Sequence, residues 1–254
     1  MLAAFEVPPL SHLFVWDELL LEGTPFAINK TVLLVFLVSI LVIVFFIAAC
    51  RRQALVPVGV QNAAEAGYHL IEENVSVGVM GEEGKRWTPF LATMFFWIFV
   101  LNIMGIIPGI QFPAASRIGI PLYLALQTWV IFVFLGFKHQ GAKYLTTVMF
   151  PPGVPKVFYV LLTPIELVSV FVIRPFSLAI RLFANLMAGH LLLTVFALMT
   201  AAFWTAKWYA VALPLPLFMS IAITAFEVLV ALLQAYIFTM LTAVYVDDSI
   251  HPAH

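Results

Sequence analysis

The fold of this chain is decided by the stretch from residue 157 to residue 202, which reads VFYVLLTPIELVSVFVIRPFSLAIRLFANLMAGHLLLTVFALMTAA. Its 46 residues are predominantly apolar, and Asp, Glu, Lys or Arg occurs only at Glu166, Arg174 and Arg181. A helix rises about 1.5 Å per residue, and the hydrocarbon core of a membrane is roughly 30 Å thick. The stretch therefore predicts a membrane-embedded segment that is too long for one perpendicular crossing.

A second long apolar run covers residues 208–246, and its 39 residues contain a single charged side chain, Glu227. Each long run could double back within the membrane, or each could be one strongly tilted helix. Neither run has a polar Gly, Asn or Asp turn in its middle. The isolated Pro175, Pro214 and Pro216 can kink a membrane helix without ending it. The pattern favours tilted helices and leaves doubling back open.

Three shorter segments predict the remaining crossings. Residues 31–49 form one uninterrupted apolar run, and residues 88–108 and 120–137 carry no charge and read as a transmembrane hairpin. Residues 53–87 contain five glutamates among apolar residues at helical spacing, which indicates a weakly amphipathic helix at the interface. The chain is thus predicted to be an all-α polytopic membrane protein with about five transmembrane helices and one interfacial helix.

We expect a single integral membrane domain over residues 1–254. Its parts are an external N-terminus (1–30), a first span (31–50), a cytoplasmic or interfacial segment (53–87), a transmembrane hairpin (88–137) and two long tilted helices (157–202 and 208–246). The N-terminus is acidic and lacks the basic region and cleavage site of a signal peptide, so the first span is expected to be retained.

The orientation follows from the distribution of Lys and Arg. In the five-crossing arrangement seven of them fall on one side: Arg51, Arg52, Lys85, Arg86, Lys138, Lys143 and Lys156. Three fall on the other side: Lys30, Arg117 and Lys207. Cytoplasmic loops carry the excess of basic residues. We therefore expect an external N-terminus and a cytoplasmic C-terminus.

Composition excludes several classes of function. Hydrophobic residues make up 63% of the chain, charged residues 10%, and the formal net charge is −1, so no basic face for nucleic acid is present. Cys50 is the only cysteine, which excludes an intrachain disulfide and a cysteine-rich metal site. The sequence has no glycine-rich nucleotide-binding loop. We expect no cofactor, no metal, and lipid and other membrane proteins as partners.

Charges inside apolar spans are informative because each costs about 3 kcal/mol or more to insert. Glu166 and Arg174 lie nearer the cytoplasmic end, where snorkelling or a local ion pair explains them as well as function does. Arg181 is deeper, has no acid within two helical turns of its own segment, and cannot lose its proton. It requires an anionic partner on another helix or another subunit, and a structural ion pair with Glu227 is the alternative.

Polar residues form stripes on both long helices. At about 100° per residue, Arg174, Ser177, Arg181 and Asn185 share one stripe, whereas His190 points to the opposite side. Glu227, Gln234 and Tyr245 share a face of the last helix. A hydrogen-bonded, water-lined path can be assembled from Asn185, His190, Glu227 and Gln234, in which His and Glu exchange protons. Taken singly, such a residue is more often an interhelical hydrogen-bonding group.

Two motifs resemble one known family. The run from Arg174 to His190, RPFSLAIRLFANLMAGH, is similar to the signature helix of subunit a of F-type ATP synthases. The run from Leu233 to Tyr245, LQAYIFTMLTAVY, is similar to its last helix. The order and length of the other segments resemble that family over essentially the whole chain. The residues around Lys30 and Arg174 suggest an actinobacterial type.

The resemblance implies a function for most of these residues. The two long helices would lie tilted against a rotating ring of c subunits, and Arg181 would face the mid-membrane carboxylate of each. The outer aqueous half-channel would be lined by Asn185, His190, Glu227 and Gln234, and the cytoplasmic one would lie near Glu166 and Ser169. Further partners would be peripheral-stalk b-type subunits and the transported H⁺, with Na⁺ left open; the chain alone would not be catalytic.

Two departures from the family pattern concern the same residues. Many bacterial relatives carry an acid at the position of His190 and a histidine at that of Glu227, so the pair is exchanged here. Glu166 lies one residue further from Arg181 than the related acid does.

The rival from another class is an ion-coupled secondary transporter, which would show repeated halves and interrupted helices at the midplane. The sequence has neither feature. A non-conducting scaffold is the second rival, and a scaffold has no need of an unpaired arginine at that depth.

Overall fold

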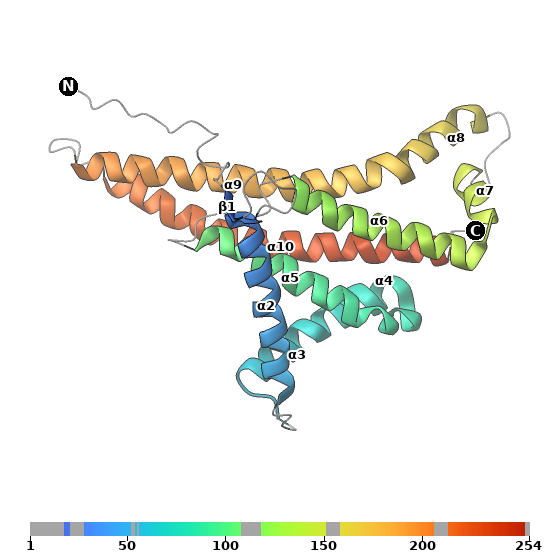
Figure 1. The fold of residues 1–254 in the computed structure, drawn as a ribbon, viewed down its shortest axis with the longest axis horizontal. Coiled ribbons are helices and arrows are strands. Elements are labelled where there is room, and N and C mark those ends of the chain that lie inside the picture. The colour runs from blue at the N-terminus through green and yellow to red at the C-terminus, as the bar shows by residue number, and fades with distance from the viewer. Residues whose placement is uncertain are drawn as a thin grey trace.

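The computed structural model describes residues 18–20, 28–51, 54, 56–107, 118–150, 158–205 and 213–251, and these are almost entirely helical (Figure 1). A short antiparallel pair, β1 (Glu18–Leu20) and β2 (Ile28–Asn29), precedes the first helix. Most of the expected external N-terminus lies outside the described residues. The same is true of four basic residues on which the orientation was predicted: Arg52, Arg117, Lys156 and Lys207.

Within the described ranges, five helices are long and apolar enough to cross a membrane. They are α2 (Lys30–Arg51), α5 (Thr88–Ile106), α6 (Gly119–Gln140), α10 (Pro214–Ile250) and the continuous run Tyr159–Trp204. That run consists of α8 (Tyr159–Val168), the π-helical turn η5 (Ser169–Ile173) and α9 (Arg174–Thr205). The predicted all-α polytopic fold with five spans is confirmed.

Each of the two long apolar runs is one helix, so the doubling-back alternative is wrong. The run through α8 and α9 has 46 residues and α10 has 37, which correspond to about 69 Å and 56 Å at 1.5 Å per residue. Both exceed a hydrocarbon core of roughly 30 Å, and tilt accommodates the excess. α9 and α10 run beside each other along the longest dimension of the molecule, while α2 crosses them steeply (Figure 1).

The segment between the first two spans is a chain of short helical turns at the surface. It comprises α3 (Val60–Ile71), the π-helical turn η1 (Glu72–Val77), α4 (Gly78–Met80) and the 3₁₀ turn η2 (Gly81–Arg86). α3 buries Ala64 and Ile71 and leaves its other side exposed, as an interfacial helix does. A further short helix, α7 (Lys143–Met149), follows α6.

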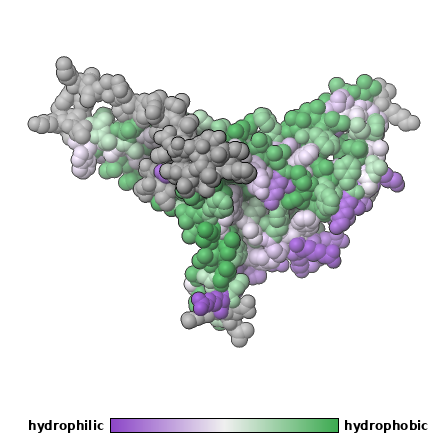
Figure 2. Space-filling view, viewed as in Figure 1, coloured by the Kyte–Doolittle hydropathy of each residue, from purple (hydrophilic) through white to green (hydrophobic). Residues whose placement is uncertain are grey.

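Hydropathy separates the ends of the molecule from its spans. Hydrophilic side chains gather near α4, near α7 and at the end of α2 that meets α3, whereas the visible surfaces of α2 and the long helices are hydrophobic (Figure 2). The apolar surface of the spans matches lipid, and the polar ends match water.

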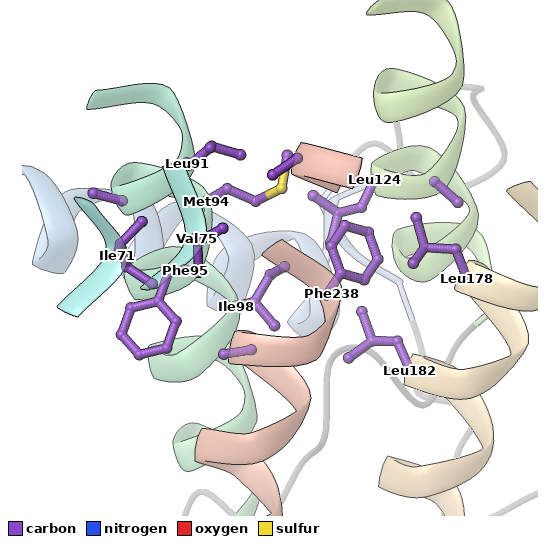
Figure 3. Close-up of a cluster of buried hydrophobic side chains, with 14 of the residues drawn as sticks. Ile71, Val75, Leu91, Met94, Phe95, Ile98, Leu124, Leu178, Leu182 and Phe238 are labelled. Atoms are coloured by element: carbon purple, nitrogen blue, oxygen red, sulfur yellow. The ribbon is translucent and has the colours of Figure 1, made fainter. Parts of the chain in front are cut away.

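The core forms where α10 is enclosed by α5, α6 and α9. Phe238 of α10 is fully buried and lies between Ile98 of α5 and Leu124 of α6, with Leu178 and Leu182 of α9 beside it (Figure 3). Small residues along α10, Ala231, Ala235 and Ala243, are also buried. Because lipid is as apolar as these side chains, such small residues let helices approach closely enough for van der Waals packing.

Candidate functional site on α9 and α10

α9 has a buried face and an exposed face, and its functional residues are divided between them. The buried face packs against the core through Leu178, Ala179, Leu182, Leu186 and Gly189. Arg181, Ala184 and Ala188 are exposed, at a spacing that places them on one stripe with Ser177. The arginine is therefore surrounded by small side chains on the outer surface of a long apolar helix.

Arg181 forms no hydrogen bond or ion pair with any residue that the structure describes. The alternative, a structural ion pair with Glu227, is not formed. Glu227 is buried against Gly189, which lies on the buried face of α9, about 80° around the helix from Arg181. Eight residues separate Arg181 from Gly189, which is about 12 Å along the helix axis. Arg181, a permanent cation, is thus separate from the buried carboxylate.

The carboxylate of Glu227 occupies the space that a side chain at Gly189 of α9 would fill. Glu227 is 8% exposed, and a Cβ added to Gly189 would overlap its carboxylate. Any residue larger than glycine would move Glu227 or separate the two helices. The half-buried His190 follows Gly189 directly, so the predicted acid and histidine lie at the same level of the two helices.

An amide that the sequence analysis missed lies beside these groups. Asn102 of α5 is fully buried, and its Nδ2 donates to the backbone carbonyl of Ala231 at 3.5 Å, between the levels of Glu227 and Gln234. Asn102 Oδ1 and Gln234 Nε2 are both buried and have no partner among the described residues. Such groups are normally satisfied by protein or ordered water. An amide inside the otherwise apolar run 88–108 was the available signal for Asn102.

Arg174 has a partner within the chain, and the local ion pair that the sequence left open is formed. Its Nη1 lies 3.3 Å from Asp248 Oδ2, and its guanidinium lies 5.0 Å from the centre of the Tyr245 ring. Ser177 donates a hydrogen bond to the Arg174 carbonyl at 3.1 Å. These contacts join the start of α9 to the end of α10, so Arg174, Ser177 and Tyr245 form one cluster apart from Glu227.

The remaining predicted residues lie elsewhere on the same long helix. Asn185, one turn beyond Arg181, is half buried. Glu166 and Ser169 are half buried near η5, and Glu166 forms no ion pair with the described residues. A π-helical turn accommodates one additional residue. Glu166 precedes Arg181 by 15 residues. If the π-helical turn takes up one of them, the other 14 make close to four turns of about 3.6 residues. Glu166 then points in nearly the same direction as Arg181.

The arrangement is suited to moving protons rather than to holding a metal. No group of three or more His, Cys, Asp or Glu side chains is placed to bind an ion in the part of the chain that the structure describes. A carboxylate and an imidazole at one level, with two incompletely bonded amides nearby, can exchange protons with water. The site and the fold together define a polytopic membrane protein with ionisable groups buried between its longest spans.

The chain belongs to the ATP synthase A chain family, whose model matches residues 32–247. The ATP synthase subunit a of Frankia alni is 41% identical over 242 residues, which cover 94% of this chain and 83% of that protein. The subunit a of Rhodococcus erythropolis is 39% identical over 251 residues, 97% of this chain and 91% of its own. That of Acidiphilium cryptum is 43% identical over 218 residues, 85% of each.

These matches confirm the family resemblance, and the Frankia and Rhodococcus proteins are actinobacterial. The role of the chain lies in the membrane sector of an ATP synthase, where it takes part in ATP synthesis and proton transport. A secondary transporter is not favoured.

Gly189→Ala tests the contact that positions Glu227. The added methyl should displace the Glu227 carboxylate from its place and should thereby lower ATP-driven proton pumping in inverted vesicles. Glu227→Asp shortens the side chain by one methylene, so Gly189→Ala should do less additional harm in a Glu227→Asp background. Gly119→Ala is the control, because a Cβ there meets nothing within 4 Å. Normal pumping by Gly189→Ala would contradict the proposed contact.

Proposed function

We propose that this chain is the stationary proton-conducting subunit of the membrane sector, presenting two offset half-channels to the carboxylates of a c-subunit ring. The observation that carries the proposal is Arg181, a permanent cation on the exposed face of α9 with no partner among the described residues. Its neighbours on that face, Ala184 and Ala188, would allow another helix to approach closely. A mid-membrane cation in that setting requires an anion supplied by another subunit.

Arg181 makes it possible for a ring carboxylate to ionise at the stator. A ring carboxyl group can pass through lipid only when it is protonated, because a bare charge there is too costly. At about 4 Å and an effective dielectric constant near 20, the guanidinium stabilises the carboxylate by roughly 4 kcal/mol. That attraction is large enough to favour release of the proton and small enough to be replaced when the next site arrives.

The polar residues on either side of Arg181 supply the two half-channels. Glu227, His190, Asn185 and Gln234, joined by Asn102, form the outer one, and Glu166 with Ser169 lies in the cytoplasmic one. Arg174, Ser177 and Tyr245 border the cytoplasmic end of the path. Since the half-channels do not meet, protons cross only by riding the ring. Each elementary charge then supplies about 2.3 kcal/mol per 100 mV, which drives rotation.

The proposed setting is the bacterial plasma membrane, with the N-terminus external and the C-terminus cytoplasmic. The proposed partners are the c-ring, peripheral-stalk b-type subunits and lipid, and the transported ion is H⁺. Catalysis of ATP synthesis belongs to other subunits of the complex.

Arg181→Ala is the decisive test. It should abolish ATP synthesis and coupled pumping while the subunit stays inserted, because the ring carboxylate would no longer ionise at the stator. Vesicles stripped of the catalytic head should also leak protons down an imposed gradient, since nothing would keep a ring site from exchanging with both half-channels. Arg181→Lys should not restore full coupling, because a compact ammonium lacks the planar fork. Near-normal ATP synthesis by Arg181→Ala would refute the mechanism.

Glu227→Gln and His190→Ala test the outer half-channel. Each should slow ATP-driven proton pumping more than it reduces the amount of assembled complex, because a titratable group is lost while the helix packing is largely kept. The exchange His190→Glu with Glu227→His should recover part of the flux if the two residues act as a unit. Loss of the whole complex in the single variants would instead indicate a structural role.

The orientation is tested at the two ends of α6. Ile118→Cys and Lys143→Cys, each in a Cys50→Ser background, should react with an impermeant maleimide from opposite faces of sealed vesicles, since α6 lies between them. We expect Lys143→Cys to react from the cytoplasmic face, as the distribution of Lys and Arg requires. Reaction of both from one face, or the reverse assignment, would contradict the topology.

A further inference from the structure

A cavity of about 330 Å³ lies where the last turn of α2 meets the first turns of α3. It opens to the surface, and Phe46, Ala49 and Cys50 of α2 line one side of it. Glu65 and Tyr68 of α3 line the other. The cavity is remote in the fold from the Arg181 and Glu227 groups, and neither the family nor the proton path accounts for it. Its walls are mainly apolar, and Glu65 is the one carboxylate among the described residues that line it; Gln61 and His69 also line it, and His69 lies 3.7 Å from Glu72 outside the cavity.

That carboxylate, Glu65, is oriented by a hydrogen bond and has no ion-pair partner among the described residues. Gln61 is 9% exposed, and its amide bonds to the backbone of Ala54. Its Oε1 accepts from the Ala54 N–H at 3.1 Å, and its Nε2 donates to the Ala54 carbonyl at 3.1 Å. The same Nε2 donates to Glu65 Oε1 at 2.8 Å. No cation among the described residues pairs with the half-buried Glu65. One carboxylate oxygen therefore remains available to a cationic group from outside the chain.

The position of the cavity indicates what that group belongs to. α2 ends at Arg51, so the cavity lies at the level of the lipid headgroups, while the body of α2 lies in the hydrocarbon. An exposed apolar stripe runs along α2 through Phe36, Ile40, Ile43 and Ile47 and reaches Cys50 at helical spacing. An acyl chain lying on this stripe would bring its headgroup to the cavity.

We propose that this cavity binds the headgroup of a phospholipid that carries a primary amine, with the ammonium against Glu65 and the start of an acyl chain against Phe46 and Ala49. A primary ammonium has three N–H donors for the free carboxylate oxygen, whereas a quaternary choline has none. An anionic headgroup without an amine would be repelled by Glu65. Burial and the nearby Glu72 raise the pKa of Tyr68, so its hydroxyl remains a donor for the lipid phosphate at neutral pH.

Cys50 makes the proposal testable, because it is the only cysteine of the chain, is exposed and lines the cavity. The intact complex would be placed in nanodiscs of phosphatidylglycerol alone, or of phosphatidylglycerol with either phosphatidylethanolamine or phosphatidylcholine. The rate of maleimide reaction at Cys50 would be followed by mass spectrometry of its peptide. We expect phosphatidylethanolamine to slow the reaction about tenfold, as a headgroup that contributes about 1.4 kcal/mol would, and phosphatidylcholine to have little effect.

Two variants separate the cavity from general effects of the bilayer. Glu65→Gln keeps the shape of the side chain and should remove the protection, while Glu73→Gln, an exposed acid outside the cavity, should keep it. Ala142→Cys with Cys50→Ser reports any effect of lipid on maleimide reactivity elsewhere and should be insensitive. Equal Cys50 rates in all three lipids, or protection that survives Glu65→Gln, would overturn the proposal. The comparison of lipids on the unmodified chain decides it even if Glu65→Gln fails to assemble.

Discussion

Close packing of α9 against α10 is the constraint on which the rest of this structure depends. Lipid tails are as apolar as Leu, so no hydrophobic gain draws two membrane helices together, and van der Waals contact must do so. Gly189 shows how close the approach is, because the Glu227 carboxylate occupies the space of its missing side chain. Covering a carboxylate with a neighbouring backbone keeps it from lipid without requiring an ion pair.

The same packing makes α9 a partition between two environments. Its buried face turns toward Glu227 and the incompletely bonded amides of Asn102 and Gln234, which water can reach only through the protein. Its other face presents Arg181 to whatever lies outside the chain. In the proposed mechanism the half-channels must not meet. A continuous helix that carries its cation on the exposed face and packs its buried face against the acid would provide that separation.

The spans could be predicted from the sequence because lipid imposes a strict requirement of length and apolarity on each of them. The choice between doubling back and one long helix rested only on the absence of turn residues. Contacts between helices were not predictable. Arg174 pairs with Asp248, 74 positions away, and Asn102 bonds to Ala231, 129 positions away. No local period encodes such pairs, since they depend on which faces meet. The π-helical turn η5, which changes the direction of Glu166 relative to Arg181, was not visible in the sequence.

Coulomb energies show why an Arg181 without an internal ion pair suits the proposed role better than an Arg181 paired within the chain would. Glu227 lies against Gly189, about 12 Å along the axis from Arg181. At that separation and an effective dielectric constant near 20, even a fully ionised Glu227 attracts the guanidinium by about 1.4 kcal/mol. A carboxylate brought to about 4 Å from outside gains roughly 4 kcal/mol on the same scale. The attraction for the external group is therefore larger by about 2.6 kcal/mol, which corresponds to roughly seventyfold in an equilibrium constant. If Arg181 and Glu227 were in contact, the guanidinium would attract Glu227 as strongly as it attracts a ring carboxylate. Ionisation of the ring carboxylate beside Arg181 would then not be favoured.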